Sequence, residues 1–202
     1  YSLIFFNKLS VKFFSNVLLR YAIAIIALSA IGHFVPEVMG LGTGTVLGAV
    51  SGEYVLYFAL IILIGKILAT SVSLGFGFFG GVFSPALLVG ASAGAVVAEL
   101  FVVVGFLEKF EPALVVSGMA AVTGAVIGAP LCMVVIVMEL TSSYIYALAS
   151  LVGLTLSVSL SHILFGASYF DRQLGARGID ISTGRSGMFL MEKRASDYGS
   201  LD

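Results

Sequence analysis

Five long apolar segments dominate this sequence. Hydrophobic residues make up 59% and charged residues 10% of the 202 residues, against about 25% charged in an average soluble domain. A helix needs roughly 20 consecutive apolar residues to cross a hydrocarbon core. We therefore expect an all-α, multi-pass integral membrane protein in a lipid bilayer. The segments are at about residues 21–35, 54–74, 83–107, 113–138 and 144–165.

Not all of these segments are clean spans. The first is short and ends in HFVPEVMG, the second carries Lys66, and GAVIGAP at 124–130 interrupts the fourth. Several helices are therefore predicted to be short, tilted or broken. Unpaired backbone groups are costly in lipid, so a broken helix must be buried in protein or line a water-filled cavity. Each break thus points toward a transport pathway.

Glycines recur at the spacing that lets membrane helices cross closely. Packing without a transport role is the simpler interpretation, and we favour it for these glycines. These glycines form one group of three, Gly40/Gly44/Gly48, and two pairs, Gly90/Gly94 and Gly124/Gly128.

Basic residues cluster at both ends of the chain, before the first acid and after the last apolar run. Cytoplasmic flanks are enriched in Lys and Arg, so both ends are expected in the cytoplasm. The net charge of −1 gives no indication of nucleic acid binding. We divide the chain into a membrane domain, residues 1–177, and a polar cytoplasmic linker or start of a further domain, residues 178–202.

The stretch GFGFFGGVFSPALLVGASAG, residues 75–94, carries the strongest chemical motif. Ser84 suits an N-cap and Pro85 the first helical position, so a helix is predicted to start there. The preceding glycines permit close backbone approach, and the amides of Gly81, Val82 and Phe83 can then point at one spot. A helix N-terminus inside the membrane is an anion site built from partial charges, weak enough to release the ion. The alternative is a glycine-rich turn between packed helices.

Three stretches resemble the CLC family of chloride channels and anion/proton exchangers. They are GKILATSVSLGFGFFGGVFSPALLVGASAG with its Gly81–Pro85 motif, SGMAAVTGAVIGAPLCMVVIVMELT, and IFFNKLSV near the start. The similarity runs from about residue 4 to residue 180. It implies a homodimer with one anion pathway per subunit, each subunit built from two inverted-topology halves. This chain is similar to the second half, so the N-terminal half is missing from it.

The resemblance also implies site residues. The amides of Val82 and Phe83 match the family's chloride ligands, beside Gly81 and Ser84. A family tyrosine falls on Phe170, with Tyr169 one residue earlier, and we expect Phe170 to supply an aromatic wall without a hydrogen bond. The family's serine ligand and gating glutamate belong to the first half, so channel and proton-coupled exchanger both stay open.

Other polar residues are interpreted as structural. Lys66 either reaches the cytoplasmic interface or pairs with a buried carboxylate. Glu99 and Glu139 lie near segment ends, and His33 and His162 stand far apart, with Cys132 as the one cysteine. No metal site and no cofactor are expected; chloride is the transported ligand, with protons as a second candidate.

Three rival functions compete with anion transport. A cation-coupled carrier for a carboxylate substrate would be indicated by a cluster of buried acids, whereas the acids of this chain lie mostly near segment ends. An intramembrane enzyme would need paired catalytic groups, and the apolar segments contain no Asp and no close His–acid pair. A non-transporting scaffold or regulatory subunit is the third. We expect an anion transporter and not an enzyme.

Overall fold

The computed structural model describes Phe6, residues 16–106 and residues 112–166. Within these residues all regular structure is helical, and four helices are long and apolar enough to cross a membrane: α2, α4, α5 and α8. The expected all-α membrane architecture is confirmed. The elements are α2 (Val17–Phe34), the 3₁₀ helix η1 (Pro36–Val38), α3 (Thr43–Val50), α4 (Leu56–Gly75), α5 (Phe83–Val103), α6 (Pro112–Ile127), α7 (Pro130–Thr141) and α8 (Tyr144–Phe165).

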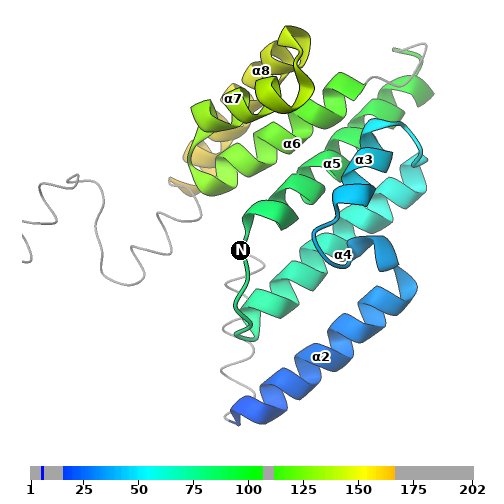
Figure 1. The fold of residues 1–202 in the computed structure, drawn as a ribbon, viewed down its shortest axis with the longest axis vertical. Coiled ribbons are helices and arrows are strands. Elements are labelled where there is room, and N and C mark those ends of the chain that lie inside the picture. Colours follow the sequence, from blue (N-terminus) through cyan, green and yellow to red (C-terminus); the bar gives the residue numbers. More distant parts are fainter. Residues whose placement is uncertain (1–5, 7–15, 107–111, 167–202) are drawn as a thin grey trace, which may run out of the picture.

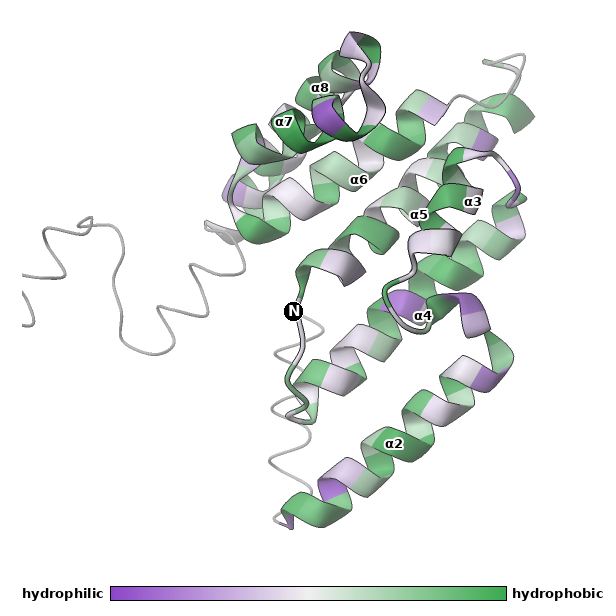
Figure 2. Ribbon diagram, in the orientation of Figure 1, coloured by the Kyte–Doolittle hydropathy of each residue, from purple (hydrophilic) through white to green (hydrophobic). Residues whose placement is uncertain are grey.

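The helices form a row in which each packs on the next. Helices α2, α4, α5 and α6 lie side by side, α3 packs on α5, and α7 and α8 lie on the far side of α6 (Figure 1). Hydrophobic residues cover most of every long helix (Figure 2). Large apolar side chains face outward, such as Leu18 at 78% and Ile163 at 81% exposure. An apolar surface of this extent suits contact with lipid or with further protein.

The predicted breaks are present, and their causes are local. Helix α6 ends before Gly128, which has φ +79°, and α7 starts at Pro130, whose missing N–H costs nothing at that position. Helix α2 ends at Phe34, two residues before Pro36. The short helix α3 was not expected from the sequence, because eight residues give too little periodicity to separate it from a loop.

The closest backbone approach joins α5 and α6. A Cβ placed on Gly118 would lie 2.5 Å from the carbonyl oxygen of Gly90 and 2.9 Å from the Cα of Gly94. The predicted Gly90/Gly94 crossing is therefore confirmed, with Gly118 as its partner. Ala91, Ala95 and Ala98 on α5 are also fully or almost fully buried. Small side chains thus let the two helix backbones touch.

The other two glycine groups differ from expectation. Gly40 lies outside any helix with φ +65°, and a Cβ placed on Gly44 would meet no atom within 4 Å. Of the three, only Gly48 is closely packed, against Tyr54. The predicted crossing at these three glycines is wrong. Gly124 packs against Leu154 of α8, whereas Gly128 belongs to the break.

Gly118→Ala should destabilise the fold, because the new methyl group meets backbone that cannot move away. We expect a loss of about 1–3 kcal/mol, the usual cost of overpacking, seen as a lower thermal unfolding midpoint in detergent. Gly44→Ala is the matched control, since its Cβ enters open space in a helix and Ala favours the helix. Equal midpoints for the two variants would contradict the close α5–α6 contact.

Candidate functional site

The glycine-rich stretch begins by ending α4. Gly77 takes φ +102°, its N–H donates to the Leu74 carbonyl, and the Phe78 N–H donates to the Ser73 carbonyl 3.1 Å away. This pair of bonds is a Schellman motif, which requires a left-handed residue and so favours glycine. Gly80 and Gly81 do not take positive φ. The glycine-rich stretch therefore ends α4 and then connects it to α5.

Helix α5 starts earlier than predicted. It begins at Phe83 with Val82 as N-cap, and no side chain caps it. Ser84 and Pro85 are thus its second and third residues, so the expected N-cap role of Ser84 and the expected start at Pro85 are wrong. The physical reason is that Ser84 already lies in the first turn, past the N-cap position from which a side-chain oxygen accepts the N2 or N3 amide. Its hydroxyl instead donates to the Leu41 carbonyl, 2.6 Å away. Pro85 is still tolerated, since the first-turn N–H groups have no intrahelical acceptor.

The start of α5 presents unpaired donors. Its first hydrogen bond runs from the Ala86 N–H to the Val82 carbonyl, which leaves the Phe83 and Ser84 amides without an intrahelical acceptor. No acidic residue lies in the first turn. A Cβ placed on Gly81 would meet no atom within 4 Å, and Gly81 and Phe83 are exposed. The 21-residue helix adds about half a positive charge at this end.

The loop between η1 and α3 holds this helix start in place. Besides the bond from Ser84 to Leu41, Gly42 packs against the Leu88 side chain in the second turn of α5. Gly42 is the N-cap of α3 with φ +72°. Leu88 is fully buried. Two contacts therefore fix the first two turns of α5 relative to α3.

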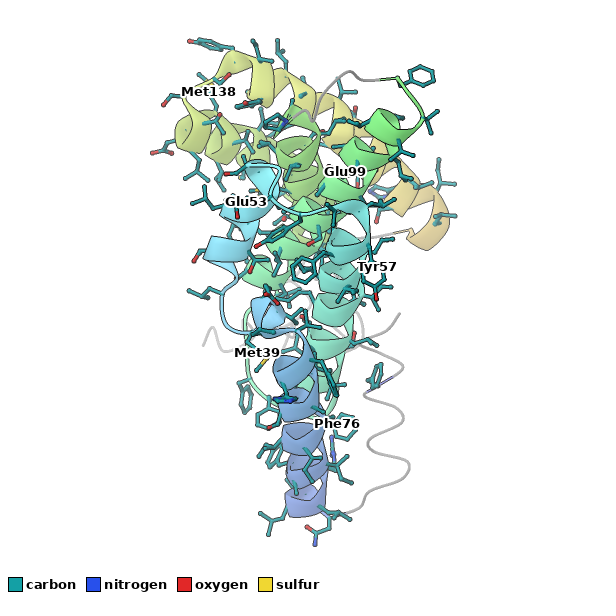
Figure 3. The ribbon with its side chains drawn as sticks, turned by 90° about the vertical axis from the view of Figure 1, so that its right-hand side faces the viewer. Met39, Glu53, Tyr57, Phe76, Glu99 and Met138 are labelled. Atoms are coloured by element: carbon teal, nitrogen blue, oxygen red, sulfur yellow. The ribbon has the colours of Figure 1, made fainter. Side chains whose placement is uncertain are left out.

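Lys66 is buried at 4% exposure and reaches the same loop. Its ammonium group donates to the Val38 carbonyl at 2.7 Å and to the Gly40 carbonyl at 3.0 Å. The expected carboxylate partner of Lys66 is wrong, because its acceptors are backbone carbonyls. In Figure 3, Met39 of this loop lies between Glu53 and Phe76 along the long axis of the molecule.

Two further polar groups lie on the neighbouring segments. Arg20 of α2 donates to the Phe76 carbonyl, 3.4 Å away, at the end of α4. Burial, followed by the nearby carboxylates of Glu53 and Glu37, raises the pKa of the Tyr54 hydroxyl. Tyr54 therefore stays neutral as a donor or acceptor at physiological pH.

The remaining predicted residues are spread over the molecule. Tyr169 and Phe170 lie outside the described residues. Glu99 is half-buried in α5 and Glu139 is exposed near the end of α7, while His33 and His162 are exposed near helix ends. Within the described residues no group of three or more His, Cys, Asp or Glu side chains gathers as a metal site would require.

Sequence reasoning missed the partners of Arg20, Lys66 and Ser84. Each donates to a backbone carbonyl that is far away in the sequence: Phe76, Val38 and Gly40, and Leu41, respectively. Any residue type supplies the same carbonyl, so no side-chain pattern marks these acceptors. Only the buried lysine in an apolar segment indicated that such a partner must exist.

Gly42→Ala should cost more stability than Gly40→Ala. Both residues take positive φ, +72° and +65°, so each substitution costs about 1–2 kcal/mol in backbone strain. At Gly42 the new methyl group also lies 2.6 Å from the Leu88 Cδ2 atom, whereas Gly40 has open space. We expect an additional loss of about 1 kcal/mol or more for Gly42→Ala, measured by thermal unfolding. A larger effect at Gly40 would contradict the contact between Gly42 and Leu88.

Comparison with known proteins identifies relatives of this chain. The uncharacterized protein MJ0305 of Methanocaldococcus jannaschii is 34% identical over 122 residues, 58% of this chain and 29% of that protein. The H(+)/Cl(-) exchange transporter ClcA of Vibrio parahaemolyticus is 26% identical over 142 residues, 70% of this chain and 30% of that protein. The putative chloride channel protein ClcB-like of Ralstonia nicotianae is 29% identical over 157 residues, 77% of this chain and 37% of that protein.

The chain thus matches only about a third of the length of these relatives. The family model described as voltage gated chloride channel matches residues 2–162, most of the chain. With its apolar helices and its glycine-led helix start, this membrane protein belongs to the voltage-gated chloride channel (CLC) family.

Proposed function

We propose that this chain forms the second half of a CLC-type anion transporter, a chloride channel or a chloride/proton exchanger. The amides of Val82 and Phe83 at the start of α5 hold the anion, with Gly81 allowing its close approach. The observation that carries this proposal is a helix start where the Phe83 and Ser84 amides lack an intrahelical acceptor, with no acid in the first turn and with Gly81 and Phe83 exposed. No cofactor takes part, and chloride is the transported ligand.

The relatives support chloride as the ion and leave the transport mode open. One relative is named as an H(+)/Cl(-) exchange transporter and another as a putative chloride channel. In this proposal the Ser84 hydroxyl is not an anion ligand in the present conformation, because its single proton goes to the Leu41 carbonyl. Ser84 contributes its backbone amide to the same end of α5.

The assembly is also part of the proposal. An N-terminal half of the same protein completes each pathway, two subunits form a homodimer, and both ends of this chain face the cytoplasm. Phe170 lines the anion site as an aromatic wall. Chloride affinity close to that of the parent after Phe170→Tyr would agree with this role, and a large loss of binding after Tyr169→Phe would argue against it.

Val82→Pro tests the amide site in the full-length protein. Proline removes one N–H, and Val82 has φ −90°, near the proline range. A hydrogen bond to a charged group contributes about 1.5–3 kcal/mol, so the half-saturating chloride concentration should rise about tenfold to hundredfold. The measurement is chloride flux from proteoliposomes.

Val55→Pro is the matched control. Val55 is the N-cap of α4 with φ −63°, so the same substitution removes an amide away from the site. Parent-like flux in Val55→Pro and weakened chloride dependence in Val82→Pro is the expected result. Equal chloride dependence in Val82→Pro and the parent would show that this amide does not bind the ion.

Proton movement, recorded in the same vesicles, separates the transport modes. Uphill proton movement coupled to chloride efflux identifies an exchanger, and chloride efflux without protons identifies a channel. A full-length protein that carries no anion at all would overturn the proposal and favour a scaffold or regulatory subunit.

A further inference from the structure

The η1–α3 segment, residues 36–42, is non-helical over most of its length and accepts hydrogen bonds from three helices. Thr45 of α3 donates to the Glu37 carbonyl at 2.8 Å. Lys66 of α4 donates to the carbonyls of Val38 and Gly40, and Ser84 of α5 donates to the Leu41 carbonyl. Four of the seven carbonyl groups in this segment are therefore held by side chains.

A lysine suits this place better than a neutral side chain. The ammonium group carries three donors and no acceptor, so one side chain pairs two carbonyls that point at one spot. Removing it would leave the carbonyl of the buried residue Val38 unpaired, which is costly in an apolar environment. Packing tightens the arrangement, because Val38 is almost fully buried and its side chain lies against Gly65, one residue before Lys66.

The same segment touches the start of α5. Leu41, whose carbonyl accepts from Ser84, directly follows Gly40, whose carbonyl accepts from Lys66. Gly42, the next residue, packs on Leu88. A change in the position of Lys66 therefore reaches the first two turns of α5 through three consecutive residues.

We propose that Lys66 is a positioning residue for the anion site, acting through the η1–α3 segment and the Ser84 hydroxyl on the amides of Val82 and Phe83. This inference rests on the proposed function. Its consequence is that anion selectivity depends on a lysine that does not touch the anion. Anions of different size need different spacing of the amides, so a displaced helix start changes their relative binding.

The test is the ratio of chloride to thiocyanate transport by the full-length protein in proteoliposomes. This ratio does not depend on the amount of folded protein, so a loss of stability alone leaves it unchanged. We expect a change of about three- to tenfold or more in Ser84→Ala, which removes one hydrogen bond, and in Lys66→Met, which removes two. Lys66→Arg, which keeps the charge, should lie closer to the parent.

A double-variant cycle separates position from charge. If Lys66 acts through Ser84, the variant with both substitutions shows no larger change than the stronger single variant. If the lysine charge acts directly on the anion, the two effects multiply, because independent sites add in free energy. Should Lys66→Met fail to fold, Lys66→Gln, which removes the charge and keeps an amide donor for one carbonyl, takes its place in the cycle under the same criterion.

Ser117→Ala is the matched control, since the Ser117 hydroxyl donates to the Ala149 carbonyl at 2.9 Å between α6 and α8, away from the helix start. Its ratio should equal that of the parent. The inference is overturned by parent-like ratios in Lys66→Met and Ser84→Ala, by multiplying effects, or by an equal change in Ser117→Ala. Absence of anion transport by the parent protein would instead overturn the proposed function, and with it this inference.

Discussion

A backbone group that leaves a helix at membrane depth needs a partner, and this constraint organises the structure. The break around η1 satisfies this constraint, and the start of α5 does not. Around η1 the free carbonyls are taken by Thr45, Lys66 and Ser84, so this break is closed by protein. At the start of α5 the amides of Phe83 and Ser84 have no acceptor in the described residues. A helix break in lipid therefore points to a pathway only where its polar groups lack protein partners.

The rigid frame behind the site comes from small residues. Gly90, Gly94 and Gly118 bring the backbones of α5 and α6 into contact, so α5 cannot slide along its neighbour without steric conflict. Its first turn is tied separately to the η1–α3 segment by Ser84 and by Leu88. A long helix fixed at both places can present its N-terminal amides in one geometry, which a site made of partial charges requires.

Much of the architecture could be predicted from the sequence, since it depends on local rules. Apolar length indicated the spans, Pro130 and Gly128 indicated the α6–α7 break, and the Gly90/Gly94 spacing indicated the α5 contact face. The errors have different causes. Helix α3 has only eight residues, too few to show a period. The acceptors of Lys66 and Ser84 are backbone carbonyls, which every residue carries. The role of Ser84 was misjudged because the helix begins one residue before it, so that Ser84 lies in the first turn and not at the N-cap.

The short helix α7 has a consequence for the synthesis of this protein. Its 12 residues extend about 18 Å at 1.5 Å per residue, well short of a hydrocarbon core about 30 Å thick. Only Ser142 and Ser143 separate it from the 22-residue α8. A nascent chain therefore cannot leave α7 in the bilayer as an independent span. Its insertion has to wait until α8 has left the ribosome, so that the hairpin enters the membrane as one unit on the surface of α6.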